Sequence, residues 1–226
     1  MESYVVRMWL PDRPGALGQV ASRIGAVRGE IVGIDILERG GGRAIDELVV
    51  DLPEKGLEAL LVQEIQQVDG VDVEEIRPVA DALHDPRLDA LETAAILVGA
   101  TGRDELLEAV VVHARRAVGA EWSAVVQLDD GAIVAEEGPV PSAAWLAAFV
   151  HGSQSSARVA AGETGPDDVV WSPLPSARFA LVVGRDGTAY RARERRQIAA
   201  FARIVDTRLR EILRYASMSH HPSVQR

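Results

Sequence analysis

The chain has 226 residues, of which 47% are hydrophobic and 26% are charged, and its formal net charge is -10. This composition is ordinary for a folded protein of one or two domains and excludes disorder over most of the length. The negative charge disfavours indiscriminate binding to nucleic acid or to acidic membranes, and the apolar stretches near residues 94–98 and 143–150 are too short to span a bilayer. Without cysteine there are neither disulfides nor thiolate metal sites, so the cytoplasm is the expected compartment.

The chain opens with a predicted strand, a tight turn and a helix. Apolar residues alternate between positions 6 and 10, which is typical of a strand. After it, Asp12 can cap a helix and Pro14 suits the first helical turn. Gly15 lets the backbone pass close to a neighbouring group. The helix then carries an apolar stripe at Leu17, Val20, Ile24 and Val27.

The next stretch predicts a hairpin, a second helix and a last strand. Residues 31–38 and 43–52 flank the flexible turn R-G-G-G at 39–42, and an apolar stripe over residues 57–68 indicates the helix. The last strand opens at Val71, but its alternation falters after Val73. The order strand, helix, strand, strand, helix, strand predicts an α+β, ferredoxin-like βαββαβ domain, with two helices on one face of an antiparallel sheet.

This first part of the chain resembles an ACT domain, a small-molecule-sensing module that usually binds amino acids. The resemblance is carried by the first strand, the turn D-R-P-G-A-L at 12–17 and the strand G-E-I-V-G-I-D-I at 29–36. ACT domains commonly pair between subunits and hold the ligand at the seam. The resemblance therefore implies a homodimer with a small-molecule ligand.

The resemblance also implies a ligand site at the turn and at the start of the second strand. Free amides at the start of the first helix would hold a ligand carboxylate. Many ACT domains carry an amide where this chain has Glu30, which could pair with a ligand ammonium but would repel a carboxylate. The alternative is a well-capped helix start that binds nothing. The candidate ligand-binding residues are Asp12, Arg13, Pro14, Gly15, Ala16, Leu17, Glu30 and Ile31.

The rest of the chain alternates helices and strands after a boundary near residue 85. Thr101 can cap the second helix of this region, and Asp129-Asp130-Gly131 is a strong hairpin signal. The pattern predicts a second α+β domain around an antiparallel sheet. Helices are expected at 88–98, from 102 onward, at 143–150 and from 191, strands at 121–128, 132–136, 169–174 and 179–184, and a loop at 152–168 with a weak strand near 157–160.

The segments V-V-W-S-P-L-P-S-A-R-F-A-L-V-V-G-R at 169–185 and R-A-R-E-R-R-Q-I-A-A-F-A at 191–202 resemble the closing third of a GAF domain. This resemblance implies a second ligand pocket. The alternative interpretation of its aromatic residues is plain core. The candidate lining residues are Trp122, Trp145, Trp171 and Phe179.

Searches for catalytic signatures find no G-x-S-x-G elbow, no Walker P-loop and no G-x-G-x-x-G after a strand. His113 has no second histidine one turn away with which to bind a metal. The arginines between residues 191 and 214 are interpreted as a solvated helix face rather than a nucleic-acid contact. The sequence therefore predicts no enzyme, cofactor or metal.

These observations predict an ACT domain at 1–80, a linker at 81–87, a GAF-like domain at 88–215 and a disordered tail at 216–226. The predicted function is that of a non-enzymatic regulatory sensor that binds an amino acid or similar small ligand at a dimer interface. Its signal would pass to the second domain or to an unknown protein partner. The alternative is a ligand-independent oligomerisation adaptor.

Overall fold

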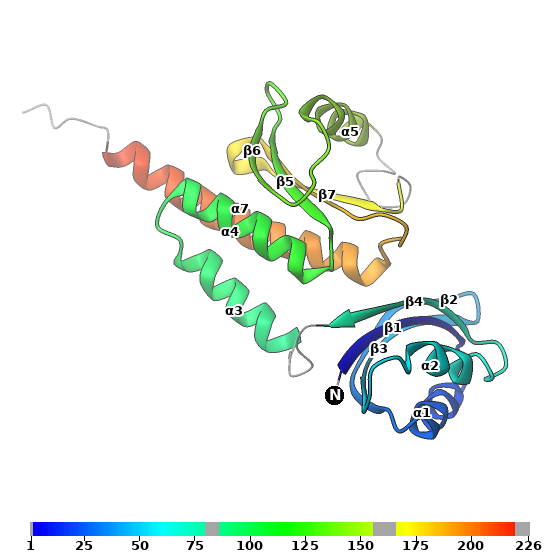
Figure 1. Ribbon diagram of the computed structural model, residues 1–226. Coiled ribbons are helices and arrows are strands. Elements are labelled where there is room, and N and C mark those ends of the chain that lie inside the picture. The colour runs from blue at the N-terminus through cyan, green and yellow to red at the C-terminus, as the bar shows by residue number, and fades with distance from the viewer. Residues whose placement is uncertain (1, 80–85, 156–165, 220–226) are drawn as a thin grey trace, which may run out of the picture. The chain divides into compact units, whose positions relative to one another are not determined.

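The computed structural model describes residues 2–79, 86–155 and 166–219. The chain forms two compact units, residues 1–85 with 191–193 and residues 86–190 with 194–226, and each contains a four-stranded antiparallel sheet (Figure 1). Most of the expected linker and the weak strand expected near 157–160 lie outside the described residues.

The first unit has the predicted βαββαβ order, with the strands arranged β2-β3-β1-β4. Helices α1 and α2 cover one face of this sheet (Figure 1). The ferredoxin-like fold predicted from the periodicity is therefore confirmed. Its elements are β1 Glu2–Pro11, α1 Ala16–Ala26, β2 Glu30–Gly40, β3 Arg43–Leu52, α2 Glu58–Ile65 and β4 Asp72–Val79.

The core of this unit lies between the sheet and its two helices. Alternate side chains of β1, including Val6 and Met8, are fully buried on the helix face, where α1 contributes Val20 and Ile24. Burial of such aliphatic side chains contributes roughly 1.5–3 kcal/mol each. The inward-facing residues of the strands and the apolar stripe of α1 thus pack together in one apolar layer.

The bulges of this sheet lie on its outer strands. Strand β2 carries one extra residue at Val32 and another at Leu37 relative to β3, and β4 carries an extra residue at Glu74 relative to β1. The bulge at Glu74 explains why the alternation of the last strand falters after Val73. The pairing of the central strands β1 and β3 is continuous from Glu2 to Pro11.

The second unit has the strand order β6-β5-β8-β7. One core forms on the face covered by α4 and α7, and a smaller core forms on the face covered by α5. Its elements are α3 Pro86–Gly99, α4 Arg103–Ala117, β5 Trp122–Gln127, β6 Ile133–Glu137, α5 Ala143–Ser155, β7 Val169–Leu174, the 3-10 helix Pro175–Ala177, β8 Phe179–Gly184 and α7 Ala192–Ser219.

Two helix ends differ from the sequence prediction. Helix α7 continues through residues 216–219, where a disordered tail was expected. At the start of α4 the N-cap residue is Gly102 and not Thr101. Thr101 instead donates hydrogen bonds from its amide and its hydroxyl to the Glu105 carboxylate, both at 2.8 Å. The helix begins one residue too late for Thr101 to cap it.

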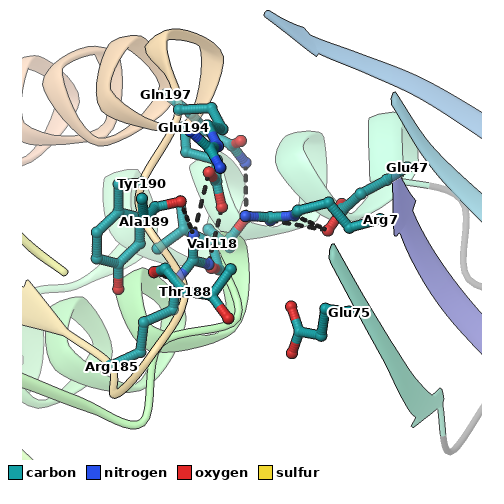
Figure 2. Close-up of polar contacts among 12 residues, drawn as sticks. Arg7, Glu47, Glu75, Val118, Arg185, Thr188, Ala189, Tyr190, Glu194 and Gln197 are labelled. Atoms are coloured by element: carbon teal, nitrogen blue, oxygen red, sulfur yellow. Dashed lines mark hydrogen bonds and ion pairs between the residues drawn. The ribbon is translucent and has the colours of Figure 1, made fainter. Parts of the chain in front are cut away.

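Arg185, at the end of β8, is buried with all five of its N–H donors engaged (Figure 2). Its Nη1 and Nη2 lie 2.8 and 3.1 Å from the two carboxylate oxygens of Glu194, and its guanidinium stacks 3.9 Å from the ring centroid of Tyr190. The guanidinium also donates to the main-chain carbonyls of Val118 at 2.9 Å, Thr188 at 2.9 Å and Ala189 at 3.0 Å. One side chain therefore ties the end of α4, the loop after β8 and the start of α7 together.

We expect Arg185→Met to lower the free energy of unfolding by about 3–5 kcal/mol, because it removes the buried guanidinium that pairs with Glu194 and donates to three main-chain carbonyls. Urea unfolding followed by tryptophan fluorescence measures the loss. The matched control is Arg178→Met, whose partner Asp129 is exposed, and it should cost less than about 1 kcal/mol. Equal losses in the two variants would contradict a structural role for the buried pair.

Candidate functional site

The turn between β1 and α1 is held by the backbone. The Asp12 amide donates to the Gly42 carbonyl at 2.9 Å, and the Arg13 amide donates to the Pro11 carbonyl at 2.8 Å. Gly15 then takes a left-handed conformation with φ +87° and serves as the N-cap residue of α1. The sequence predicted an Asp12 cap, and this is wrong because three residues separate Asp12 from the helix.

Gly15 is required here by its backbone angle. A Cβ built on it would meet no other described atom within 4 Å, but a φ of +87° is strained for any residue with a side chain. No side chain caps the helix in the described structure. The Ala16 amide donates to the Arg13 carbonyl at 3.3 Å and the Gln19 amide donates to the Gly15 carbonyl at 3.0 Å, whereas the amides of Leu17 and Gly18 lack an intrahelical acceptor. They carry the positive end of the helix dipole.

The turn is open to solvent. All four residues from Asp12 to Gly15 are exposed, whereas Ala16 is buried and Leu17 is half-buried. The Arg13 guanidinium lies along the helix, where it donates to Gln19 Oε1 at 3.1 Å. The Arg13 side chain therefore does not cap the amides at the helix start.

The structure does not bring Glu30 and Ile31 to this turn. Glu30 of β2 pairs with Asp51 of β3, and Asp51 in turn pairs with Ser3 of β1. Glu30 is therefore level with the start of β1, whereas the turn follows Pro11 at the end of β1. The strand spans roughly 26 Å between these positions at the usual rise per residue. Within one chain the two halves of the predicted site are therefore at opposite ends of the sheet.

Near the turn, β3 carries a buried acidic residue that the sequence analysis missed. Asp46 lies opposite Met8 of β1 and Ile36 of β2, and it is only 3% exposed. Its Oδ1 atom has no hydrogen-bond partner among the described residues. A buried carboxylate oxygen without a partner costs free energy, so it requires an explanation.

The environment of Asp46 disfavours its charged form. Burial raises the pKa of the Asp46 carboxyl, the positive charge of Arg39 lowers it in part, and the negative charge of Asp12 raises it. The pairing of Asp46 with Met8, three residues before Pro11, places this residue near the turn. The sequence does contain a signal for this residue. Leu48, Val50 and Leu52 alternate along the strand, and the same alternation continued backwards places Asp46 on the inner face of the sheet.

The four aromatic residues predicted to line a GAF-like pocket do not share one face of the second sheet. Trp122 and Trp145 make an edge-to-face contact with ring centroids 6.4 Å apart, and Trp171 packs in the same core beneath α5. Phe179 lies in the core on the opposite face, beneath α4 and α7. The predicted pocket is therefore wrong as a single site, because the sheet separates Phe179 from the tryptophans.

The second unit has a different hollow, a cavity of about 450 Å³ between α4 and β6. Its floor is apolar, with Leu107 and Val111 both buried. Its walls carry the acidic residues Asp104, Glu108, Glu136 and Glu137. No group of three or more histidine, aspartate or glutamate residues in the described ranges is arranged to hold a metal ion, and none of the described helices is long and apolar enough to cross a membrane.

No protein-family model and no curated protein matches the chain. Among solved structures, the ACT domain from a GTP pyrophosphokinase of Chlorobium tepidum is 16% identical over 35% of this chain and 100% of its own, with a TM-score of 0.28. A formyltetrahydrofolate deformylase from Pseudomonas putida KT2440 is 15% identical over 39% of this chain, which covers only 36% of the deformylase, with a TM-score of 0.27.

An unknown protein from Galdieria sulphuraria is 15% identical over 93% of this chain and 92% of its own, with a TM-score of 0.33. TM-scores this low carry no argument about function. The assignment of the first unit to the ferredoxin-like fold therefore depends on its own strand order and pairing.

We expect Asp46→Asn to raise the free energy of unfolding of the first unit at neutral pH by about 1 kcal/mol or more, because it removes a buried charge that has no partner. The raised pKa makes the folded state bind a proton more tightly than the unfolded state does. In the wild type this stabilisation is present at low pH and is lost as pH rises through the folded-state pKa. The free energy of unfolding of the Asp46→Asn variant should not fall in this way as pH rises.

Urea unfolding between about pH 4 and about pH 7, followed by circular dichroism and tryptophan fluorescence, measures both effects. Glu54→Gln is the matched control, because Glu54 is an exposed acid at the opposite end of β3. A wild type and an Asp46→Asn variant with the same pH profile would contradict a buried, destabilising carboxylate.

Proposed function

We propose that this protein is a non-enzymatic regulatory sensor whose first unit binds an amino acid or a similar small ligand at the interface of a homodimer. The Asp12–Leu17 turn holds the ligand carboxylate. Signalling then proceeds through the second unit or an unknown protein partner, because the ligand favours one conformation over another.

The observation that carries the proposal is the open start of α1. The amides of Leu17 and Gly18 lack an intrahelical acceptor, no side chain caps α1 in the described structure, and the residues from Asp12 to Gly15 are exposed. This arrangement suits an anionic group such as a carboxylate. If the turn were only a well-capped helix start, a side chain would occupy these donors.

The position of Glu30 supports a site made by two copies of the chain. Strand β2 lies at an edge of the sheet. When two such edges pair antiparallel about a two-fold axis, the start of one strand lies beside the end of the other. The partner's Glu30 would thus approach the end of β1 where the turn lies. The ammonium of the ligand could pair with that carboxylate, as the sequence analysis expected.

We expect at least one of the twenty amino acids to raise the melting temperature of the wild-type protein by several degrees. A ligand at a hundred times its Kd adds about 2.7 kcal/mol to the free energy of unfolding. Gly15→Asp should abolish the shift, because it places a carboxylate beside the first-turn amides. A thermal-shift screen with the purified 226-residue chain measures both.

The control variant is Gly56→Asp. Gly56 has φ +85° and open space around it, as Gly15 does, but it lies in the turn after β3 at the other end of the sheet. Both substitutions introduce similar backbone strain, so only the loss of ligand response should distinguish them. A shift that survives Gly15→Asp would move the site away from the turn. If no amino acid gave a shift, the adaptor would become the better description.

The adaptor alternative is favoured by one feature, the apolar surface of β2. Val32, Ile34 and Ile36 are 44%, 50% and 39% exposed. Exposed apolar side chains grouped on an edge strand are typical of an association surface. Such a surface holds two chains together whether or not a ligand is present.

We expect Ile34→Arg to convert the dimer to a monomer, because it places a charge on the paired edge. Size-exclusion chromatography with light scattering measures the mass. Leu60→Arg is the control: Leu60 is 43% exposed on α2, away from β2, and the substitution should leave the dimer intact. A wild-type protein that is monomeric at all concentrations tested, with and without amino acids, would refute the dimer in both descriptions.

A further inference from the structure

Asp46 is placed by its strand beside the proposed ligand site. Strand β3 pairs with β1 without interruption, so its even-numbered side chains, including those of Leu48 and Val50, point to the face that α1 and α2 cover. Asp46 belongs to this series. It lies opposite Met8, three residues before Pro11, so it is near the end of the strand pair where the Asp12–Leu17 turn begins.

The packing of the first unit does not account for an acid at this position. The neighbouring inward positions of β3 are Ala44, Leu48, Val50 and Leu52, all buried and apolar. Asp46 is equally buried, yet its Oδ1 atom has no hydrogen-bond partner among the described residues. An apolar residue would be more stable here, so the acid is best explained by a group that is bound at this point.

We propose that Asp46 is the cation-binding group of the ligand site, and that the ligand is a zwitterion whose ammonium pairs with Asp46 while its carboxylate is held by the first-turn amides of α1. This inference rests on the proposed function, because it assigns the second charged group of the same site. It makes the partner's Glu30 secondary to a residue of the chain that provides the turn.

The surroundings of Asp46 suit a small zwitterion. Arg39 is exposed and lies on β2 opposite Ala44, the inward position of β3 next to Asp46, so an incoming ammonium can take the place of its positive charge there. The exposed Ile34 and Ile36 lie on the adjacent strand β2, where they could contact the carbon chain of the ligand. Two opposite charges separated by a short apolar segment are the complement of these groups.

The test uses the whole 226-residue chain in a thermal-shift experiment with two sets of probes. The first set is the twenty amino acids together with 4-aminobutanoate, which separates its ammonium from its carboxylate. The second set is the matching carboxylic acids without an amino group, such as propanoate for alanine and butanoate for 4-aminobutanoate. A Kd for each responding probe then follows from titration calorimetry.

The expected result is that at least one zwitterion binds the wild type while its counterpart without the amino group binds at least tenfold more weakly. Asp46→Asn should weaken the same zwitterion at least tenfold, and Glu54→Gln should leave its Kd unchanged. A response to α-amino acids alone places the two charges on adjacent groups, and a response to 4-aminobutanoate alone places them further apart. Either pattern supports the proposal.

Three outcomes would overturn it. If a zwitterion bound Asp46→Asn as tightly as the wild type, Asp46 would have no role, while the proposed sensor would stand. If the carboxylic acids bound the wild type as tightly as the zwitterions, no cation site would exist; this comparison needs no variant and holds even if Asp46→Asn failed to fold. If no probe bound the wild type, both the sensor and its cation site would be refuted.

Discussion

The uninterrupted pairing of β3 with β1 is the constraint on which the first unit depends. Because neither strand bulges against the other, the two-residue period runs through the whole of β3 and fixes which side chains face the helices. A slip of one residue would place Leu48 and Val50 on the other face and would remove Asp46 from the helix side. The same register that builds the core therefore forces one carboxyl into it.

Two buried charged side chains, Arg185 in the second unit and Asp46 in the first, differ in how they are paired. Arg185 has an oppositely charged partner, three carbonyls and an aromatic ring around it, so its guanidinium is fully satisfied. Asp46 is as deeply buried, but its Oδ1 atom has no partner among the described residues. A satisfied buried charge fixes a fold, whereas an unsatisfied one lowers stability and is retained where it has another use. Of these two buried charges, Asp46 is therefore the one that packing does not explain.

Local sequence patterns predicted most elements, because the patterns depend on near neighbours. The strands at 43–52, 169–174 and 179–184 have the boundaries that alternation and turn residues indicated. The Asp12 cap was wrong because an extra tight turn separates it from the helix. The predicted aromatic pocket was wrong because the pairing of β5 with β8 decides which face of the sheet each residue lies on. Gly184 lies opposite Trp122 and therefore shares its face, and Phe179, five residues before Gly184 on the same strand, lies on the other face. That register cannot be read from either strand alone.

The candidate site was predicted in part for the same reason. The Gly15 turn has a local signature, but Asp46 comes to the site only through strand pairing, and Glu30 could reach it only from a second chain.

The uneven edges of the first sheet limit how far the protein can assemble. On β4 the bulge at Glu74 and the missing amide of Pro78 interrupt the row of donors that another strand would need. On β2 the bulges at Val32 and Leu37 leave only a short regular stretch between them. A sheet with one usable edge can pair with one other copy of itself, and the resulting pair has no second edge of this sheet to which a further copy could add. Association through this edge therefore ends in a closed pair and cannot grow into a fibre.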